Sequence, residues 1–220
     1  MDTSNRQILG QQALPEPTLR RLPWYLAYVS ALSARGVEYV SSTSMARELS
    51  VDSSQIAKDM SFLNIRGKTR IGYEVKALEQ VLEDFLGFRR QHNAVVIGAG
   101  SLGAALMCDS GLLRYGLRIV AGFDVSADVI GKKIGGIEVY PMERLSELSH
   151  VLDARVCIVT VPYEAAQQVA DACMDAGISG IWNFTPSRIR VREGVVIQNT
   201  SIYSNLAVMY NRLGLLPDKR

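Results

Sequence analysis

Apolar residues recur at helical spacing in the first third of the chain and form short strand-like runs afterwards. The stretch 18–36 predicts one amphipathic helix, because its apolar residues are three and four positions apart, Thr18 can cap it and Gly36 can stop it. The polar residues 1–17, with two prolines, are expected to form a flexible arm. The apolar set is Leu22, Tyr25, Leu26, Val29 and Leu32.

Two shorter helices are predicted between residues 42 and 63, on either side of the polar stretch SVDSS. Ser42 or Thr43 can cap the first, and Asp52 or Ser53 can cap the second. Two short capped helices at this spacing are typical of a helix-turn-helix. Their inward sets are Met45, Ala46 and Leu49, then Ile56, Met60 and Leu63.

A basic, glycine-containing turn, RGKTR, follows and leads into the strand-like IGYEV. Beside a helix-turn-helix this predicts a wing, from which Lys68 and Arg70 can reach phosphates or a minor groove. The helix KALEQVLEDFLG then links this region to the next and ends at Gly87. The second short helix should present polar side chains outward for DNA contacts. The candidate DNA-binding residues are Ser54, Gln55, Lys58, Ser61, Lys68 and Arg70.

The charge distribution limits any DNA-binding surface to a local patch. The whole chain carries a net charge of +2, which does not by itself indicate a polyanion partner. Residues 54–76, however, hold five basic and two acidic residues, a local balance of +3. A small helical domain with a solvated basic loop is the alternative interpretation.

The stretch VVIGAGSLGAAL, from Val95, predicts the first turn of a dinucleotide-binding unit. Gly98, Gly100 and Gly103 have the G-x-G-x-x-G spacing, with an apolar strand before them and a helix after. The next strand, LRIVAGFD, ends at Asp124, 21 residues past Gly103, where a carboxylate can bind ribose hydroxyls. That carboxylate would repel a 2′-phosphate, so NAD(H) is favoured over NADP(H). An ordinary strand-end residue is the alternative for Asp124.

Strands and helices keep alternating to about residue 184, which predicts a parallel sheet with right-handed crossovers. Ligands bind outside the carboxyl ends of such strands. TVP at 160–162 and NFTP at 183–186 fall at these ends and can line a nicotinamide pocket, although simple turn chemistry around proline explains them equally well. The tail has a final apolar stripe that must be covered by its own domain or by a partner subunit: Ile202, Leu206, Met209 and Leu213.

Catalytic machinery is not apparent. His92 precedes the first strand of the sheet, His150 follows a helix, and no Tyr-x-x-x-Lys pair occurs. The three cysteines have no metal-ligand spacing and are expected to be buried thiols, so no metal site is predicted. With neither a signal peptide nor a membrane-length apolar run, a cytoplasmic location is expected. A nucleotide fold joined to a winged helix favours binding that biases a DNA-binding state over turnover.

These segments together resemble the Rex family of redox-sensing transcriptional repressors. The likeness lies in LPEPTLRRLPWYLAYVSAL, GVEYVSSTSMARELSVDSSQIAKDMSF, VVIGAGSLGAAL and VTVPYEAAQQVADACMDAGISGIWNFTP, and it runs from Leu14 to Leu213. The resemblance implies a homodimer that binds operator DNA when NADH is scarce, releases it when NADH binds, and exchanges its C-terminal helices.

Carried over by position, the resemblance assigns DNA contacts to Lys58, Lys68 and Arg70. It assigns the dinucleotide to residues of the glycine loop and of two strand ends. The first group is Gly98, Gly100, Ser101, Leu102, Gly103 and Asp124, and the group near the nicotinamide is Thr160, Val161, Pro162, Asn183, Phe184 and Pro186.

Four positions depart from the family's pattern. Ala57 stands where an arginine is usual, and Ser101 where an asparagine is usual. Asp109 and Ser201 replace a tyrosine and an aspartate that take part in the family's switching. These departures imply a divergent member that reads a different operator, responds weakly to NADH or senses another ligand.

The predicted architecture is α/β: a winged-helix DNA-binding domain at 1–87, a Rossmann domain with a doubly wound parallel sheet at 88–201, and a dimerisation helix at 202–220. The predicted function is a repressor, not an enzyme, whose operator binding follows the NADH/NAD⁺ ratio. The alternatives are an NAD(H)- or CoA-binding oxidoreductase-like protein, and a paralogue that binds DNA without ligand control.

Overall fold

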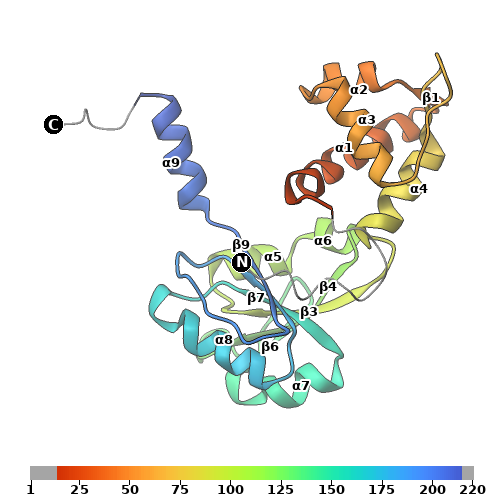
Figure 1. Ribbon diagram of the computed structural model, residues 1–220. Helices are drawn as coiled ribbons and strands as arrows, with labels where there is room; N and C mark the ends of the chain where they lie inside the picture. Colours follow the sequence, from red (N-terminus) through yellow and green to blue (C-terminus); the bar gives the residue numbers. More distant parts are fainter. Residues whose placement is uncertain (1–13, 215–220) are drawn as a thin grey trace. The chain divides into compact units, whose positions relative to one another are not determined.

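The computed structural model describes residues 14–214, and the chain divides into two compact units, with the boundary in the sequence between Arg90 and Gln91 (Figure 1). Each unit is described by itself. The division lies close to the boundary expected at residue 87. Most of the predicted arm, residues 1–13, lies outside the described residues, and Glu16 and Pro17 already belong to the first helix.

The first unit contains four helices and a two-stranded antiparallel sheet among its described residues. In the sheet, Tyr39 pairs with Glu74 and Val40 with Tyr73. The strands bring the segment after α3 back beside the start of α2, which is the arrangement of a winged helix. The elements are α1 (Glu16–Ala34), β1 (Tyr39–Val40), α2 (Ser42–Leu49), α3 (Ser53–Phe62), β2 (Tyr73–Glu74) and α4 (Val75–Leu86).

One apolar core holds this unit together. The expected stripe of α1 is buried, and α4 contributes the fully buried Leu78 and Leu82. The helix predicted as a linker is therefore part of the core. It ends at Gly87, whose φ of 74° is a left-handed conformation that glycine adopts without strain.

Two predicted caps in this unit are wrong. Helix α1 starts at Glu16, because Pro15 and Pro17 occupy positions that favour a helix start, so Thr18 lies inside the helix and is buried. Ser41, rather than Ser42 or Thr43, caps α2 and accepts a hydrogen bond from the amide of Ser44. The expected cap of α3, Asp52, is confirmed.

The second unit is built on a seven-stranded sheet with the order β5-β6-β4-β3-β7-β8-β9. All neighbours are parallel except β5 and β6, which form a hairpin at one edge. The strand order reverses between β3 and β7, which is where doubly wound sheets bind ligands. The strands are β3 (His92–Ile97), β4 (Leu117–Asp124), β5 (Lys133–Ile134), β6 (Ile137–Pro141), β7 (Ala154–Val159), β8 (Gly180–Asn183) and β9 (Val196–Asn199).

Helices cover both faces of this sheet. On one face, Val95 and Ile97 pack in a core with α7 and α8; on the other, Val96 packs with Met107 of α5. The predicted doubly wound parallel sheet is confirmed. The helices are α5 (Ser101–Met107), α6 (Ser110–Arg114), η1 (Met142–Arg144), α7 (Leu145–Val151), η2 (Tyr163–Ala165), α8 (Ala166–Asp175) and α9 (Ile202–Arg212).

Three sequence expectations differ from the structure here. The helix after the glycine loop is interrupted at Cys108, because Asp109 leaves the helical conformation and caps a new helix, α6. Cys108 is exposed rather than buried, whereas Cys157 and Cys173 are buried. Strand β9 is an edge strand that the sequence did not reveal.

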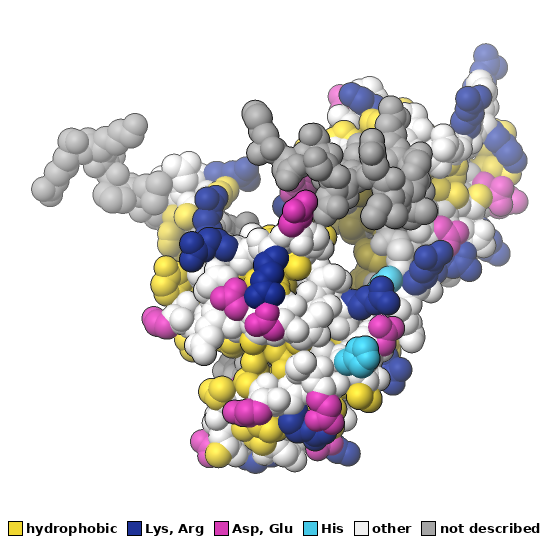
Figure 2. Space-filling view, turned by 60° about the horizontal axis from the view of Figure 1, so that its bottom comes forward, with side chains coloured by type: hydrophobic (Ala, Val, Ile, Leu, Met, Phe, Trp, Pro, Cys, Tyr) yellow, Lys and Arg dark blue, Asp and Glu magenta, His cyan; other side chains and the backbone are white. Residues whose placement is uncertain are grey.

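Within residues 14–214, no side chain of the tail helix α9 is fully buried. Its exposed apolar residues appear in yellow along the helix at the left of Figure 2. No helix among residues 14–214 is long and apolar enough to cross a membrane.

Candidate functional sites

The start of α3 is fixed by its cap. Asp52 accepts hydrogen bonds from the amide of Ser54, at 2.8 Å, and from its hydroxyl, also at 2.8 Å. The hydroxyl bond is the largest cause of a lowered pKa for Asp52. Ser54 is exposed as expected, but its hydroxyl proton is already engaged in the cap.

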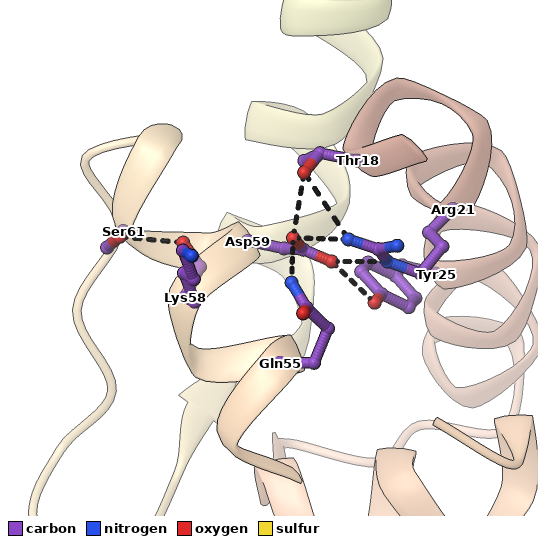
Figure 3. Close-up of polar contacts among 7 residues, drawn as sticks. All are labelled: Thr18, Arg21, Tyr25, Gln55, Lys58, Asp59 and Ser61. Atoms are coloured by element: carbon purple, nitrogen blue, oxygen red, sulfur yellow. Dashed lines mark hydrogen bonds and ion pairs between the residues drawn. The ribbon is translucent and has the colours of Figure 1, made fainter. Parts of the chain in front are cut away.

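A buried carboxylate, that of Asp59, joins α3 to α1 (Figure 3). Arg21 donates twice, from Nε to Oδ2 at 2.7 Å and from Nη2 to Oδ1 at 2.8 Å. The hydroxyls of Tyr25 and Thr18 donate to Oδ2 and Oδ1, at 2.8 and 3.1 Å. Gln55 donates from Nε2 to Oδ1 at 2.9 Å. These five hydrogen bonds are called the Asp59 network below.

The network keeps its carboxylate ionised. Burial alone raises the pKa of Asp59, but the hydrogen bonds from Arg21, Tyr25, Gln55 and Thr18 lower it by more, so the pKa lies below its usual value. The pKa of Arg21 is raised, chiefly by its hydrogen bond to Asp59. The pKa of Tyr25 is raised by burial and then by the same carboxylate. The structure thus contains a satisfied buried ion pair.

The outer face of α3 only partly matches the prediction. Lys58 and Ser61 are exposed, whereas Gln55 is half-buried and donates to the Asp59 network. The Ser61 hydroxyl donates to the carbonyl oxygen of Lys58 at 2.6 Å, which leaves it only as an acceptor (Figure 3). The Lys58 ammonium has no side-chain partner among the described residues.

The wing is a tight turn closed by Lys68 and Gly72, whose backbones exchange hydrogen bonds of 2.8 and 2.9 Å. Gly72 has a φ of 109°, and a β-carbon there would overlap the carbonyl oxygen of Val40, so glycine is required. At the tip, exposed Arg70 has a φ of 64° and no ion pair within the described chain. The Lys68 ammonium donates to the Tyr39 hydroxyl at 2.6 Å, and this bond raises the pKa of Lys68.

A surface hollow of about 550 Å³ lies between α3 and the wing. Ala57, one of the four positions expected to depart from the family's pattern, lies on one side, and Arg66 lines the same hollow. Arg66 is exposed and was not among the predicted contacts. Its position in the basic turn was the available signal.

In the second unit, the three glycines of the loop after β3 have different surroundings. A β-carbon on Gly98 would lie 2.9 Å from the carbonyl oxygen of Thr160, and one on Gly103 would overlap the carbonyl oxygen of Gly98. A β-carbon on Gly100 would meet nothing within 4 Å. Gly98 and Gly103 are therefore required by packing, while Gly100 leaves open backbone that a phosphate group can approach.

Two side chains hold this loop in place. The Thr160 hydroxyl, at the end of β7, is 2.7 Å from the Gly98 carbonyl oxygen and 3.1 Å from that of Ile97. Asp124, at the end of β4, accepts from the Ala99 amide at 2.7 Å and from the amides that follow it. The structure thus brings the glycine loop, Asp124 and Thr160 together beside the strand-order reversal. Ser101 and Leu102 are exposed at the start of α5.

The second predicted pocket segment is arranged around Asn183, which is completely buried. Its amide nitrogen donates to the Ser187 carbonyl and to Asn199, and its oxygen accepts from the Thr185 amide and hydroxyl. These four bonds use the hydrogen-bonding capacity of the side chain, so Asn183 can serve a ligand only by shaping the loop.

Around that loop, Val161 and Phe184 are half-buried, and Pro162 and Pro186 are exposed. The Phe184 ring lies 4.9 Å from Trp182, whose indole nitrogen donates to Thr200 at 2.8 Å.

Two of the departures from the family's pattern have a local role. The Asp109 carboxylate caps α6 by accepting from the Gly111 amide at 2.7 Å. Ser201 caps α9 by accepting from the Ser204 amide at 3.0 Å. Both residue types are strong helix caps.

Sequence models of two families match the chain, one for each unit. Residues 13–61 match a family described as "Putative DNA-binding protein N-terminus", and residues 89–187 match one described as "CoA binding domain".

Similar proteins extend over nearly the whole chain. A redox-sensing transcriptional repressor Rex of Porphyromonas gingivalis (strain ATCC BAA-308 / W83) is 54% identical over 97% of this chain and 98% of its own. A repressor of the same name from Treponema denticola is 40% identical over 92% and 99%.

Solved structures of repressors are also similar to the chain over nearly its whole length. A repressor called RSP, in complex with β-NAD⁺ and operator DNA, superposes with a TM-score of 0.88 at 29% identity and covers 93% of this chain and 94% of its own. RSP with β-NADH gives a TM-score of 0.83 at 30% identity, over 93% and 96%. The identity and the coverage show that the chain belongs to the Rex family of redox-sensing transcriptional repressors.

Proposed function

We propose that this protein is a transcriptional repressor that binds operator DNA through α3 and the wing and binds NADH or NAD⁺ at the glycine loop. The ratio of the two dinucleotides controls its binding to DNA. The function is one of binding, without turnover, as in the repressors to which the chain is related.

One observation carries this proposal: a single chain combines an exposed cationic helix and wing with a glycine loop whose central residue faces open space. Lys58 and Arg70 project from the first unit without side-chain partners among residues 14–214, and Gly100 occupies the open position in the second. Unpaired cations suit phosphates and base edges, and the open loop suits a pyrophosphate.

The loop's surroundings support a dinucleotide without a 2′-phosphate. Asp124 lies beside the loop with Oδ2 on the Ala99 amide, so a ribose bound at the end of β4 would meet a carboxylate. Hydroxyls can donate to that group, whereas a phosphate is repelled. We infer that Val161, Phe184 and the two prolines near them bind the nicotinamide end. They lie next to Thr160, which donates to the Gly98 carbonyl oxygen, and Asn183, which donates to that of Ser187.

Dimerisation through α9 completes the proposed arrangement. The helix and its C-terminal cap, Leu213, leave large apolar side chains exposed, and such a surface is typical of an interaction site. Those in the helix are Ile202, Tyr203, Val208, Met209 and Tyr210. A dimer also fits a palindromic operator, because protein and DNA then share a two-fold axis. Such a repressor works on cytoplasmic DNA, and this is the location we propose.

A CoA-binding function is the second candidate, because residues 89–187 match the family of that description. Calorimetric titration of the full chain with NADH, NAD⁺, CoA and ATP separates the two. We expect saturable binding of NADH in the micromolar range or tighter, which corresponds to a binding free energy of about −8 kcal/mol or below. Tight binding of CoA with no response to NADH would favour the alternative.

Gel mobility shift tests the coupling. Duplexes selected by the protein from a randomised pool should be shifted without nucleotide and released by NADH but not by NAD⁺. A shift that NADH leaves unchanged would contradict ligand control and leave DNA binding intact.

A further inference from the structure

The Asp59 network affects both the packing of α3 against α1 and the hydrogen-bonding groups that α3 exposes. Three of its donors come from α1, namely Thr18, Arg21 and Tyr25, and reach across to α3. The fourth, Gln55, is one turn earlier on α3 itself, at the edge of the predicted DNA-reading face. Figure 3 shows the Gln55 amide with its nitrogen toward the carboxylate.

A carboxylate can only accept hydrogen bonds, and this determines which way the Gln55 amide is turned. The amide nitrogen must face Asp59, so the carbonyl oxygen and the second N–H remain for other partners. An unanchored glutamine can rotate its amide and offer a donor or an acceptor in the same direction. The structure therefore restricts Gln55 to one of two chemical presentations.

We propose that Asp59 is a specificity-determining positioning residue. It contacts no base but fixes the position of α3 against α1 and the orientation of the Gln55 amide. The inference rests on the proposed function, since it requires α3 to lie in the major groove. With Oε1 outward, Gln55 favours a base that offers a donor there, which is adenine N6 or cytosine N4. Adenine also has N7 to accept the second N–H.

The sequence offers a matched control for this role. Arg20, next to Arg21, makes the same kind of pair, with Nη2 2.7 Å from Glu16 Oε1, but both members of that pair are exposed. Arg21 has only 20% of its side chain exposed and its partner Asp59 has none. Exposed pairs contribute little, whereas removing one member of a buried pair leaves an uncompensated charge.

The test uses the full chain and three variants. The double variant Arg21→Met/Asp59→Leu replaces the ion pair with apolar groups, an exchange that buried pairs often tolerate. Gln55→Leu removes the reading group at a half-buried surface position, and Arg20→Gln is the control. Each protein is incubated with a randomised duplex pool, and the enriched sequences are read. Affinity is then measured for the duplex that the wild-type chain enriches and for the unselected pool.

We expect the wild-type chain to enrich adenine or cytosine at one position of each half-site. Both Gln55→Leu and the double variant should lose that preference. Their affinity for the selected duplex should fall on the order of 10- to 100-fold, while their affinity for the unselected pool stays unchanged. Arg20→Gln should match the wild-type chain in both measurements.

Retention of the wild-type preference by the folded double variant would overturn the proposal. Proportional weakening on both kinds of DNA, with the preference intact, would do the same, because it indicates a role in folding alone. If the double variant does not fold, Gln55→Leu remains decisive, since an unchanged preference would show that Gln55 reads no base. Failure of the wild-type chain to bind any duplex would instead contradict the proposed function.

Discussion

The Thr160 hydroxyl and the Gly98 carbonyl oxygen are 2.7 Å apart, and they join the ends of β7 and β3 where the strand order reverses. The same Gly98 carbonyl lies where a β-carbon on Gly103 would be, so the loop is held from two sides. The candidate dinucleotide site is therefore set by contacts within the protein before a ligand arrives.

Replacing Thr160 by valine should loosen this loop with little change in volume. We expect a free energy of unfolding lower by about 1 kcal/mol, the usual contribution of one hydrogen bond. NADH affinity should fall several-fold by calorimetry, because the loop is less well ordered. Ser179→Ala, at the exposed amino end of β8, should change neither quantity. Unchanged NADH affinity in Thr160→Val would contradict the role of this bond.

The glycine loop allows a sharper comparison. Gly100 has a φ of −68° and open space around it, so Gly100→Ala should unfold at the wild-type temperature and bind NADH at least 10-fold more weakly. Gly103→Ala should be destabilised, because the added carbon overlaps a backbone oxygen. Thermal unfolding and calorimetry on both proteins measure this. Normal NADH binding by Gly100→Ala would place the ligand elsewhere.

The wing tip can be tested through its charge. Glycine adopts the left-handed φ of 64° at position 70, so Arg70→Gly should keep the turn and remove one cation. Because each subunit of the proposed dimer loses one phosphate contact, we expect the magnitude of the slope of log K against log salt for duplex binding to fall by about 2. Arg155→Gln, on the second unit, is the control. An unchanged slope for Arg70→Gly would exclude a phosphate contact at this position.

The Asp59 network predicts a pH dependence. Because the pKa of Asp59 is lower in the folded than in the unfolded chain, its contribution is complete above the unfolded value of about 3.9 and declines as pH falls through the folded value. The wild-type chain should thus lose stability below about pH 4 more steeply than Asp59→Asn. In proteins that also carry Trp182→Phe, unfolding followed by Trp24 fluorescence reports on the first unit.

The exposed Asp84→Asn substitution is the control for that experiment and should leave the acid slope unchanged. The raised pKa of Tyr25 predicts the opposite behaviour at high pH, where stability is lost as pH rises above about 10. Parallel acid curves for the wild-type chain and Asp59→Asn would contradict the protected carboxylate.

The tail helix predicts a dependence of assembly on its apolar face. Met209→Asp puts a charge on that face and should shift the chain from dimer to monomer in sedimentation equilibrium. Asn211→Asp, two positions along α9 and so on another side of the helix, should remain dimeric. A Met209→Asp variant as dimeric as the wild-type chain would show that α9 is covered in another way.

Local signals predicted much of this fold. The Asp52 cap, the glycine spacing and the alternation of apolar strands with helices each depend on neighbours in the chain, and the structure confirms them. Right-handed crossovers then leave few sheet orders to consider. Strand β9 was missed because its residues, VIQN, lie at a sheet edge and show no clear apolar alternation.

The roles of Asp59 and Asn183 depend on distant residues and were not predicted. Asp59 is buried by Arg21, 38 positions away, and a charged residue in a polar helix does not disclose such a partner. The one signal was its place on the buried face of α3, between Ile56 and Met60. Asn183 was expected near the nicotinamide, and only the folded loop shows that its amide is fully occupied.

The chain has two tryptophans, one in each unit, so each unit has its own intrinsic fluorescent reporter. Trp182, against Phe184 beside the candidate nicotinamide pocket, should transfer excitation energy to reduced dinucleotide, whereas Trp24 lies 61% exposed on α1. A Trp24→Phe protein would then report only on the second unit and a Trp182→Phe protein only on the first. Binding of the dinucleotide by the second unit and release of DNA by the first could be timed separately, without any attached dye.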